Sequence, residues 1–241
     1  MSAENSVFTL LSLGDKGWGD ELLLGAVLTL ELALVSLAVG LVLGLATAGA
    51  KISHSRVLRF LASGYTNLIR GIPEFLIILL VFFGADQLMV SITGALNYDG
   101  VIEVNKFVAG VLALSLIFGA FASEVFRGAY QAVPNGQIEA GLACGMRPSQ
   151  IFWRIRMPQM WRYAIPGLGN LWMVLLKDTS LVSVIALDEL LRQSNIAGET
   201  TREPFLFYMV AALIYLLLTI VSDFGRHRME LRANRGVRRA G

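Results

Sequence analysis

Histidine and cysteine, which serve in many catalytic and metal sites, are scarce in this 241-residue chain. The sequence contains two histidines, His54 and His227, and a single cysteine, Cys144, which cannot form an internal disulfide. No Cys/His cluster has the spacing of a metal site, and no Gly-x-x-x-x-Gly-Lys-Ser/Thr phosphate-binding loop is present. The sequence therefore predicts a protein that is not an enzyme, cannot hydrolyse ATP by itself and holds no cofactor or metal of its own.

Six polar residues stand in strongly apolar surroundings and are candidates for lining a substrate path. They are Glu31, Glu74, Asn170, Lys177, Asp178 and Ser180. A charge near the centre of a bilayer costs at least about 2.5–3.5 kcal/mol, so such residues are functional or paired. Consecutive residues point about 100° apart on a helix, so Lys177 and Asp178 cannot simply neutralise each other. Two interpretations stay open. Either Asp178, Thr179 or Ser180 lines the path together with Asn170, or the charged residues form an ion pair between subunits.

The two glutamates among these candidates differ from the rest. A carboxylate in a dry passage would suit a cationic substrate, and Glu74 is the best single candidate for that role. Glu74 also stands where an apolar stretch begins, so it could instead cap a helix and interact with the helix dipole. Glu31 could likewise be an acid that packs in the outer half of a membrane helix.

Long apolar stretches must position these residues. Hydrophobic residues make up 55% of the chain and charged residues 16%, which is more apolar than a soluble core needs. A helix needs about 20 mainly apolar residues to cross a bilayer. The stretches of suitable length are Leu22–Ala50, Ile72–Ile92, Phe107–Ser123, Ala164–Leu187 and Phe205–Ser222. The sequence therefore predicts an all-α, polytopic membrane helix bundle with about five transmembrane helices.

The distribution of Lys and Arg predicts the orientation of this bundle. Fifteen of these residues fall in the alternate regions 51–70, 124–163 and 223–241. Only four fall in the other connecting regions, 1–21, 86–106 and 187–204. Because basic residues accumulate on the cytoplasmic side, the N-terminus is expected outside and the C-terminus inside.

This topology divides the chain into three parts. We expect a short outer lead-in at 1–21, a transmembrane region at 22–222 and a basic cytoplasmic tail at 223–241. The arginines of the tail could attract anionic lipid or nucleic acid, but the favoured interpretation is a topology anchor. Membrane lipid is therefore an expected partner, and nucleic acid is not.

The polar segment between the third and fourth crossings has its own helix signals. Pro134 and the residues after it predict a turn, and 137–144 contains good helix formers. Gly145 can supply a left-handed stop, and Pro148 suits the first turn of a second short helix, which Pro158 is expected to end. The second helix would carry an apolar face made of Ile151, Phe152 and Ile155. An exposed apolar knob beside arginines suits contact with another protein.

This segment, about 134–160, resembles the "EAA" loop of ABC importer permeases. The matching positions are Glu139, Ala140, Gly141, Gly145, Ile155 and Pro158. The chain departs from the pattern at Gly141, which replaces the second alanine, and at Met157, which replaces the usual leucine. In the family, the loop forms cytoplasmic coupling helices that fit a groove on a cytosolic ATPase subunit. The resemblance implies that Glu139, Ala140 and Gly145 lie at that contact; an ordinary interfacial loop that anchors helices is the alternative.

The resemblance extends over nearly the whole chain. Residues 25–46, 65–84 and 158–190 resemble the first, second and fourth helices of polar amino-acid permeases of the type I ABC importer class. Within that group, the Pro73-Glu74 pair is most similar to permeases of the histidine/lysine/arginine/ornithine and arginine importers. The implied function is half of the translocation pathway for a basic amino acid (arginine, lysine, histidine or ornithine) or an opine. A permease for neutral or acidic amino acids is the alternative.

The resemblance also implies partners and a location. A homologous permease subunit, either another copy or a relative, would complete the pore. A cytosolic ATPase dimer would bind ATP and Mg²⁺, and a periplasmic amino-acid-binding protein would deliver the substrate. The expected location is the cytoplasmic (inner) membrane of a bacterium. A self-contained secondary carrier is disfavoured because the sequence has no visible internal repeat.

Overall fold

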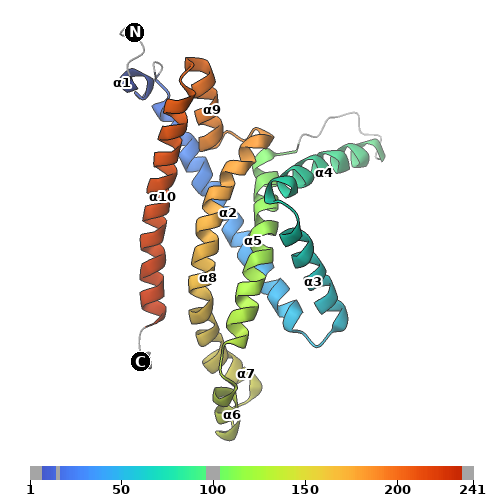
Figure 1. The fold of residues 1–241 in the computed structure, drawn as a ribbon. Coiled ribbons are helices and arrows are strands. Elements are labelled where there is room, and N and C mark those ends of the chain that lie inside the picture. The colour runs from blue at the N-terminus through green and yellow to red at the C-terminus, as the bar shows by residue number, and fades with distance from the viewer. Residues whose placement is uncertain (1–6, 15–16, 96–103, 235–241) are drawn as a thin grey trace. The chain divides into compact units, whose positions relative to one another are not determined.

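A computed structural model describes residues 7–14, 17–95 and 104–234 of the chain (Figure 1). Parts of the expected lead-in, of the connection at 86–106 and of the basic tail lie outside these residues. Within the described residues the secondary structure is helical, without strands. The elements are α1 (Val7–Leu10), α2 (Gly19–Ile52), α3 (Arg56–Gly71), α4 (Glu74–Ala95), α5 (Lys106–Gln131), α6 (Asn135–Ala143), α7 (Pro148–Ile151), the π-helical turn Phe152–Arg156, α8 (Met157–Asp178), the 3₁₀ segment Thr179–Ile185, α9 (Leu190–Thr201) and α10 (Pro204–Ala233).

Helices long and apolar enough to span a membrane occur five times in the described chain. They cover Gly19–Ile52, Glu74–Thr93, Lys106–Gln131, Pro148–Ile185 and Pro204–Ala233. The predicted all-α bundle with five transmembrane helices is therefore confirmed. Each expected apolar stretch falls largely within one of these helices, but most of the helices extend beyond the apolar residues.

The largest extension is at the C-terminal end. The last crossing is expected to end at Ser222, but α10 continues to Ala233 and includes the first half of the expected tail. Arg226 supports this continuation because its guanidinium bonds Asp223 Oδ1 and Glu230 Oε1, each at 2.6 Å, within one helical turn on either side. Such pairs stabilise a helix beyond its apolar part.

The region between the first and second expected crossings is also helical. Ser55 caps α3 by accepting the N–H of Leu58 on its hydroxyl, at 3.4 Å. The helix ends before Pro73, because a residue that precedes proline avoids the helical conformation, and Ile72 is extended with φ −109° and ψ 139°. Pro73 then starts α4, whose first residue is Glu74.

The prediction that Pro158 ends the second short helix is wrong. Pro158 is the second residue of α8, and the chain stays helical from Pro148 to Ile185. The π-helical turn explains why: Met157 donates its N–H to Phe152, five residues back. Pro158 has no N–H, so it cannot donate the regular α-helical hydrogen bond, but it also leaves no donor unsatisfied. The wider turn before it accommodates this interruption without ending the helix.

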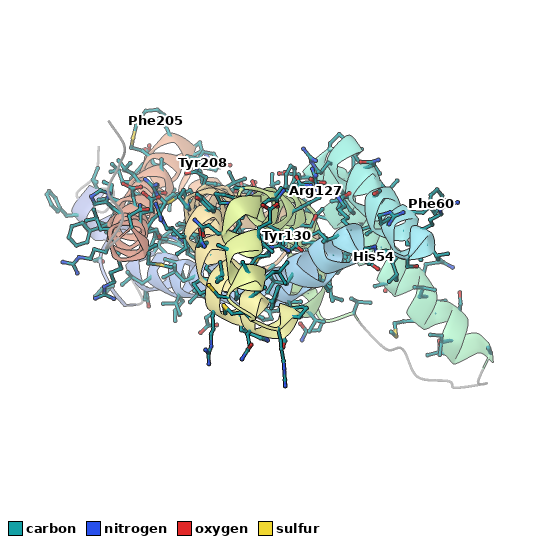
Figure 2. All side chains as sticks on the ribbon, turned by 90° about the horizontal axis from the view of Figure 1, so that it is seen from below. His54, Phe60, Arg127, Tyr130, Phe205 and Tyr208 are labelled. Atoms are coloured by element: carbon teal, nitrogen blue, oxygen red, sulfur yellow. The ribbon has the colours of Figure 1, made fainter. Side chains whose placement is uncertain are left out.

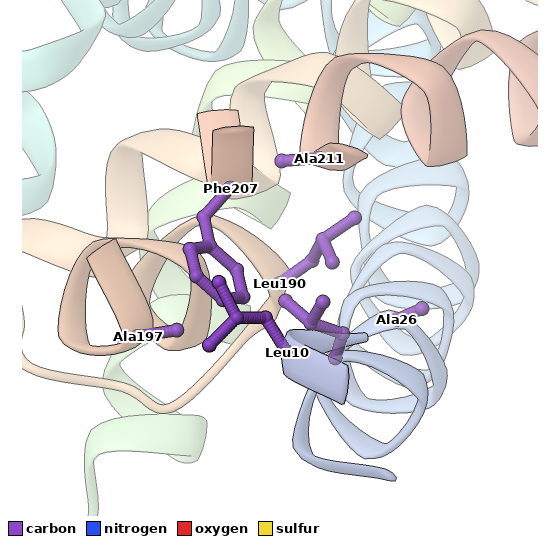
Figure 3. Close-up of a cluster of buried hydrophobic side chains, with 7 residues drawn as sticks. Leu10, Ala26, Leu190, Ala197, Phe207 and Ala211 are labelled. Atoms are coloured by element: carbon purple, nitrogen blue, oxygen red, sulfur yellow. The ribbon is translucent and has the colours of Figure 1, made fainter. Parts of the chain in front are cut away.

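Contacts divide the chain into two compact units, and α2, α5, α8 and α10 each contribute to both. The first unit consists of Met1–Ser36, Pro73–Leu114 and Leu175–Thr219. Its core contains Leu10, Leu22, Ala26, Leu190, Ala197, Phe207 and Ala211, which come from α1, α2, α9 and α10 (Figure 3). Gly25 permits close packing here, because a Cβ at this position would lie 3.0 Å from the backbone of Leu190.

The second unit consists of Leu37–Ile72, Ser115–Val174 and Ile220–Gly241. Small residues bring α2 and α5 together: a Cβ on Gly40 would meet the ring of Phe118 at 2.7 Å. A Cβ on Gly44 would meet Ala122 at 2.8 Å. The ring of Phe126 packs edge-to-face on Trp161, 5.7 Å between centroids, and so joins α5 to α8. These contacts hold α2, α5 and α8 together within the second unit.

Candidate functional site

The short helix α6 and the turn after it carry the residues that resemble a coupling motif. Gly145 has a φ of +76°, in the left-handed region, and ends α6 as the sequence predicts. Two hydrogen bonds close this turn: Met146 donates its N–H to Gly141 O at 3.0 Å, and Gly145 donates to Leu142 O at 2.9 Å. The next helix starts at Pro148, again as predicted.

Gly141, the departure from the family pattern, has a structural explanation. It is buried, and a Cβ there would lie 3.1 Å from Ile155 Cδ1 and 3.2 Å from Ile151 Cγ1. The side chains of Ile151 and Ile155 therefore pack against α6 instead of projecting from the loop. The prediction of an exposed knob made of Ile151, Phe152 and Ile155 is wrong, because Ile151 is buried and the other two are half-buried.

The surface that remains exposed on this segment comes from other residues. Glu139, Ala140 and Gly145 are all exposed. The exposed large apolar side chains are Leu142, at 53%, and Trp153, at 63%. Leu142 follows Gly141 directly, so packing that turns Gly141 inward leaves Leu142 outward on this short helix. The candidate coupling residues thus lie on an accessible surface with apolar and acidic groups.

Two side-chain contacts connect this segment to the long helices of the second unit. The guanidinium of Arg156 hydrogen-bonds Tyr130 Oη and lies over the Tyr130 ring, 4.2 Å from its centroid. Gln159, at the start of α8, hydrogen-bonds the Gln137 side chain on α6. These contacts join the π-helical turn to α5 and α6 to α8.

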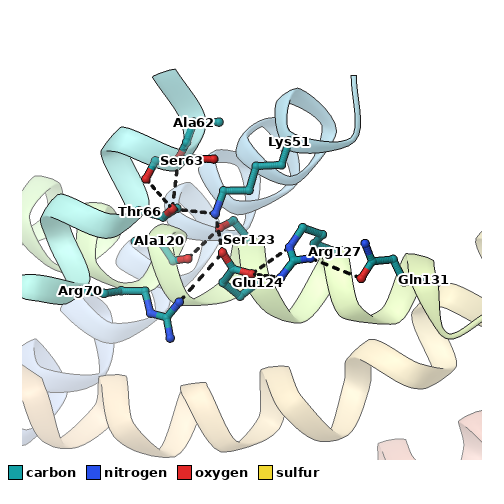
Figure 4. Close-up of polar contacts among 10 residues, drawn as sticks. All are labelled: Lys51, Ala62, Ser63, Thr66, Arg70, Ala120, Ser123, Glu124, Arg127 and Gln131. Carbon is teal, nitrogen blue, oxygen red and sulfur yellow. Dashed lines mark hydrogen bonds and ion pairs between the residues drawn. The ribbon is translucent and has the colours of Figure 1, made fainter. Parts of the chain in front are cut away.

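A polar cluster joins α2, α3 and α5 in the same unit (Figure 4). We call Lys51, Thr66, Arg70, Glu124 and Arg127 the Glu124 cluster. The ammonium of Lys51, whose side chain is only 7% exposed, bonds Glu124 and donates to Thr66 Oγ1 at 2.6 Å. On the other carboxylate oxygen, Arg127 donates at 2.7 Å, and Arg70 lies 4.0 Å from the first oxygen.

Sequence reasoning did not identify this cluster. Lys51 and Arg70 are counted there only as topology signals, and Glu124 lies just beyond an expected crossing. A possible signal was an acid at the end of a membrane helix with basic residues at the ends of two others.

A separate contact also joins α3 to α5. Tyr65 donates its hydroxyl to Leu116 O at 2.6 Å, and burial raises the pKa of Tyr65 to about 12.

The candidate path residues of the first unit include a close pair. Glu74 begins α4 and Asp178 ends α8, and their carboxyl groups lie within hydrogen-bonding reach of each other. Lys177 is exposed and within electrostatic range of Asp178. This structure brings together two acids that are more than 100 residues apart in the sequence.

The other candidates do not join this pair. Ser180 is half-buried and donates its hydroxyl to Lys177 O at 2.7 Å, while the neighbouring Thr179 is fully buried. Glu31 is exposed on α2, within the first unit. Asn170 is exposed on α8 and belongs to the second unit.

The first unit also contains a buried carboxyl group that the sequence does not single out. Glu189 is fully buried and caps α9, accepting the N–H groups of Leu191 at 2.9 Å and Arg192 at 2.8 Å. Tyr215 on α10 donates its hydroxyl to Glu189 Oε2 at 3.0 Å, and Thr29 Oγ1 on α2 lies 3.5 Å from the same oxygen. Burial raises the pKa of Glu189 to about 7, although these donors favour the ionised form. One carboxyl group thus connects three helices.

Comparison with known proteins identifies relatives along nearly the whole chain. The family model for the binding-protein-dependent transport system inner membrane component matches residues 40–235. The nopaline transport system permease protein NocQ of Agrobacterium fabrum is 48% identical, over 95% of this chain and 98% of the relative. The histidine/lysine/arginine/ornithine transport system permease protein HisQ of Salmonella typhimurium is 45% identical, over 93% and 98%. The arginine ABC transporter permease protein ArtQ of Escherichia coli is 42% identical, over 88% and 94%.

Solved structures agree with this relationship. A chain from the crystal structure of an amino acid ABC transporter with histidines has a TM-score of 0.79 and 31% identity, over 89% of this chain and 95% of that one. An inward facing conformation of the MetNI methionine ABC transporter has a TM-score of 0.64, over 98% and 100%; at 16% identity it shows the fold alone. The helical fold, the family match and the long, closely related alignments together show that this multi-pass membrane protein belongs to the family of binding-protein-dependent transport system inner membrane components, as a transport permease subunit.

Proposed function

We propose that this chain forms half of the translocation pathway of an ATP-driven importer for basic amino acids or opines in the bacterial cytoplasmic membrane. The names of its relatives support the substrate class, since histidine, lysine, arginine and ornithine have basic side chains and nopaline is an opine. The structural observation that carries the proposal is the pairing of Glu74 with Asp178 in the first unit.

Two carboxylates at such short range repel each other, and little water is present in a membrane helix bundle to screen them. A guanidinium or ammonium group between them would remove the repulsion and form charge-assisted hydrogen bonds with both. Lys177 lies in the vicinity, so a substrate cation would compete with a resident one. The pair therefore favours a cationic ligand over an anionic one.

The proposal places the basic ends of the helices in the cytoplasm, with the N-terminus outside and the C-terminus inside. There, α6 and the Gly145 turn would contact a cytosolic ATPase dimer, which binds ATP and Mg²⁺. Support comes from the exposure of Glu139, Ala140 and Gly145 and from the contacts of Arg156 and Gln159 with neighbouring segments. A second permease subunit and a periplasmic binding protein would complete the importer.

Substrate selection is tested by Glu74→Gln in the purified complex reconstituted into proteoliposomes with its binding protein. Loss of one charge-assisted hydrogen bond, worth roughly 1.5–3 kcal/mol, should weaken stimulation of ATP hydrolysis by arginine about 10-fold or more. Asp86→Asn is the matched control, because Asp86 is an exposed acid on the same helix. An unchanged response in Glu74→Gln would reduce Glu74 to a helix cap and remove the basis of the cation preference.

Coupling is tested separately by charge reversal. Glu139→Lys should abolish co-purification of the ATPase while the permease still inserts into the membrane. Glu203→Lys, at an exposed acid next to α10, should retain the ATPase. Gly145→Asp should also abolish transport, because it adds a charge at the same surface. Normal uptake in both α6-region variants would contradict the coupling role.

A further inference from the structure

A pocket of about 330 Å³ lies in the second unit, between the C-terminal ends of α2 and α5 and the start of α8. Its walls are mainly apolar and include Ala48, Gly49, Phe126, Phe152, Met157 and Met160. Pockets that hold small ligands usually measure about 300–1,000 Å³, so this one has room for part of an extended apolar group. Methionine side chains adapt to flexible ligands. The residues that line the pocket all belong to the second unit, whereas Glu74 and Asp178 belong to the first.

Polar groups at the pocket belong to residues that bond arginines. Tyr130, which lines it, accepts a hydrogen bond from Arg156, and the Arg156 guanidinium stacks over the same ring. Ser53, which also lines it, accepts on its carbonyl from Arg59 Nη1 at 2.7 Å. Tyr130 and His54, which directly follows Ser53, are labelled in the view from below (Figure 2).

One of these arginines has an unused donor. Arg156 Nε is buried and has no hydrogen-bond partner among the described residues. A buried N–H without a partner is unfavourable, and a planar guanidinium binds phosphate oxygens well. The pocket therefore has an apolar lining, and two of its lining residues are bonded by arginines from outside it. One of these arginines, Arg156, has a donor without a partner among the described residues.

We propose that this pocket binds an anionic phospholipid, with one acyl chain inside it and the phosphate group at Arg156 and Arg59. Lipid is the favoured occupant because the pocket is formed by ends of membrane-spanning helices, where acyl chains and headgroups meet. The orientation proposed above places the pocket at the cytoplasmic leaflet. The negative surface potential of that leaflet raises the membrane affinity about fivefold for each arginine near it.

The site also bears on coupling. Phe152 is the first residue of the π-helical turn that connects α7 to α8, Met157 directly follows that turn, and both line the pocket. An acyl chain in contact with both residues would stabilise this turn, whose hydrogen bonds are irregular. Lipid binding would then affect how movement of the α6–α7 segment reaches α8.

Photo-crosslinking of lipid in proteoliposomes of the intact complex tests the proposal without an activity measurement. The probe is phosphatidylglycerol with a diazirine at the end of one acyl chain, in phosphatidylcholine bilayers, and crosslinked residues are mapped by mass spectrometry. We expect crosslinks at Met157, Met160 or Phe126. The same diazirine on phosphatidylcholine should crosslink several-fold less, and Arg156→Gln or Arg59→Gln should each lower the phosphatidylglycerol signal about fivefold.

A pair of glycine substitutions provides the matched test of location. Gly49→Leu should remove the pocket crosslinks, because Gly49 lines the pocket and a Cβ there meets no atom within 4 Å. Gly128→Leu should keep them, because Gly128 is an equally open helical glycine that does not line the pocket. Equal crosslinking by the two headgroups would overturn the anionic assignment. Crosslinks that persist in Gly49→Leu, or that are absent from the unmodified complex because a partner protein fills the pocket, would overturn the lipid site.

Discussion

Replacement of Glu124 by glutamine removes the carboxylate that Lys51, Arg70 and Arg127 share. In the native chain, the buried ammonium of Lys51 bonds both Glu124 and Thr66. The variant keeps the Thr66 hydroxyl as an acceptor but leaves three cations without their counter-ion. We therefore expect Glu124→Gln to lower the free energy of unfolding much more than a change at an exposed member of the cluster.

The magnitude follows from the exposure of each partner. Breaking a buried ion pair by removing one member costs roughly 3–5 kcal/mol. The lower end applies here, because the Glu124 side chain is 25% exposed and Lys51 retains one hydrogen bond. A loss of about 3 kcal/mol lowers the folding equilibrium constant about 150-fold. Arg127→Gln, at a side chain 39% exposed, should cost only about 0–1 kcal/mol.

The assay is unfolding of the purified chain in mixed detergent micelles, with tryptophan fluorescence as the signal. Trp161 reports on the second unit because it packs on Phe126. The double variant Lys51→Met/Glu124→Gln should recover most of the loss, since it leaves no buried ammonium. If Glu124→Gln and Arg127→Gln unfold at the same denaturant concentration, the Lys51–Glu124 pair does not stabilise the fold and the reasoning is refuted.

Two further predictions concern other parts of the fold. The pKa of Glu189 is raised from 4.5 to about 7 in the folded chain, so folding takes up a proton and the contribution of Glu189 to stability falls as pH rises from about 4.5 to about 7. Glu189→Gln should therefore make the unfolding midpoint less dependent on pH over that range. If the variant shows the same pH dependence as the native chain, Glu189 is not its source. Gly44→Leu should lower stability by about 1–3 kcal/mol through overpacking against Ala122, measured by the same unfolding titration. Gly128→Leu, where a Cβ has open space, should leave the midpoint unchanged or raise it, and equal losses in the two variants would argue against close packing at Gly44.

Features that depend on local sequence could be predicted well. Five crossings follow from long apolar stretches, because hydropathy over about 20 residues decides whether a segment enters a bilayer. The left-handed turn at Gly145 and the helix start at Pro148 follow from the backbone preferences of glycine and proline. The ends of helices were less predictable: α10 runs to Ala233 because ion pairs continue it beyond its apolar residues.

Packing explains why two predictions for the segment at about 134–160 are wrong. The sequence places Ile151, Phe152 and Ile155 on one face but does not say what covers that face. In the structure, the missing side chain of Gly141 makes room for Ile151 and Ile155, so the apolar exposure shifts to Leu142 and Trp153. The continuation of the helix past Pro158 depends on a π-helical turn, which has no clear sequence signal.

By itself, the sequence determined that this chain is a helical membrane protein, where its crossings lie and which loop resembles a coupling motif. These properties depend on residues that are close together in the sequence, so they can be predicted without knowledge of the fold. Only the tertiary structure decided that Glu124 joins Lys51, that Glu189 joins Thr29 and Tyr215, and that Glu74 lies beside Asp178. Such pairs depend on how each helix is rotated and which helix it packs against, and residues distant along the chain carry no local signal of that choice.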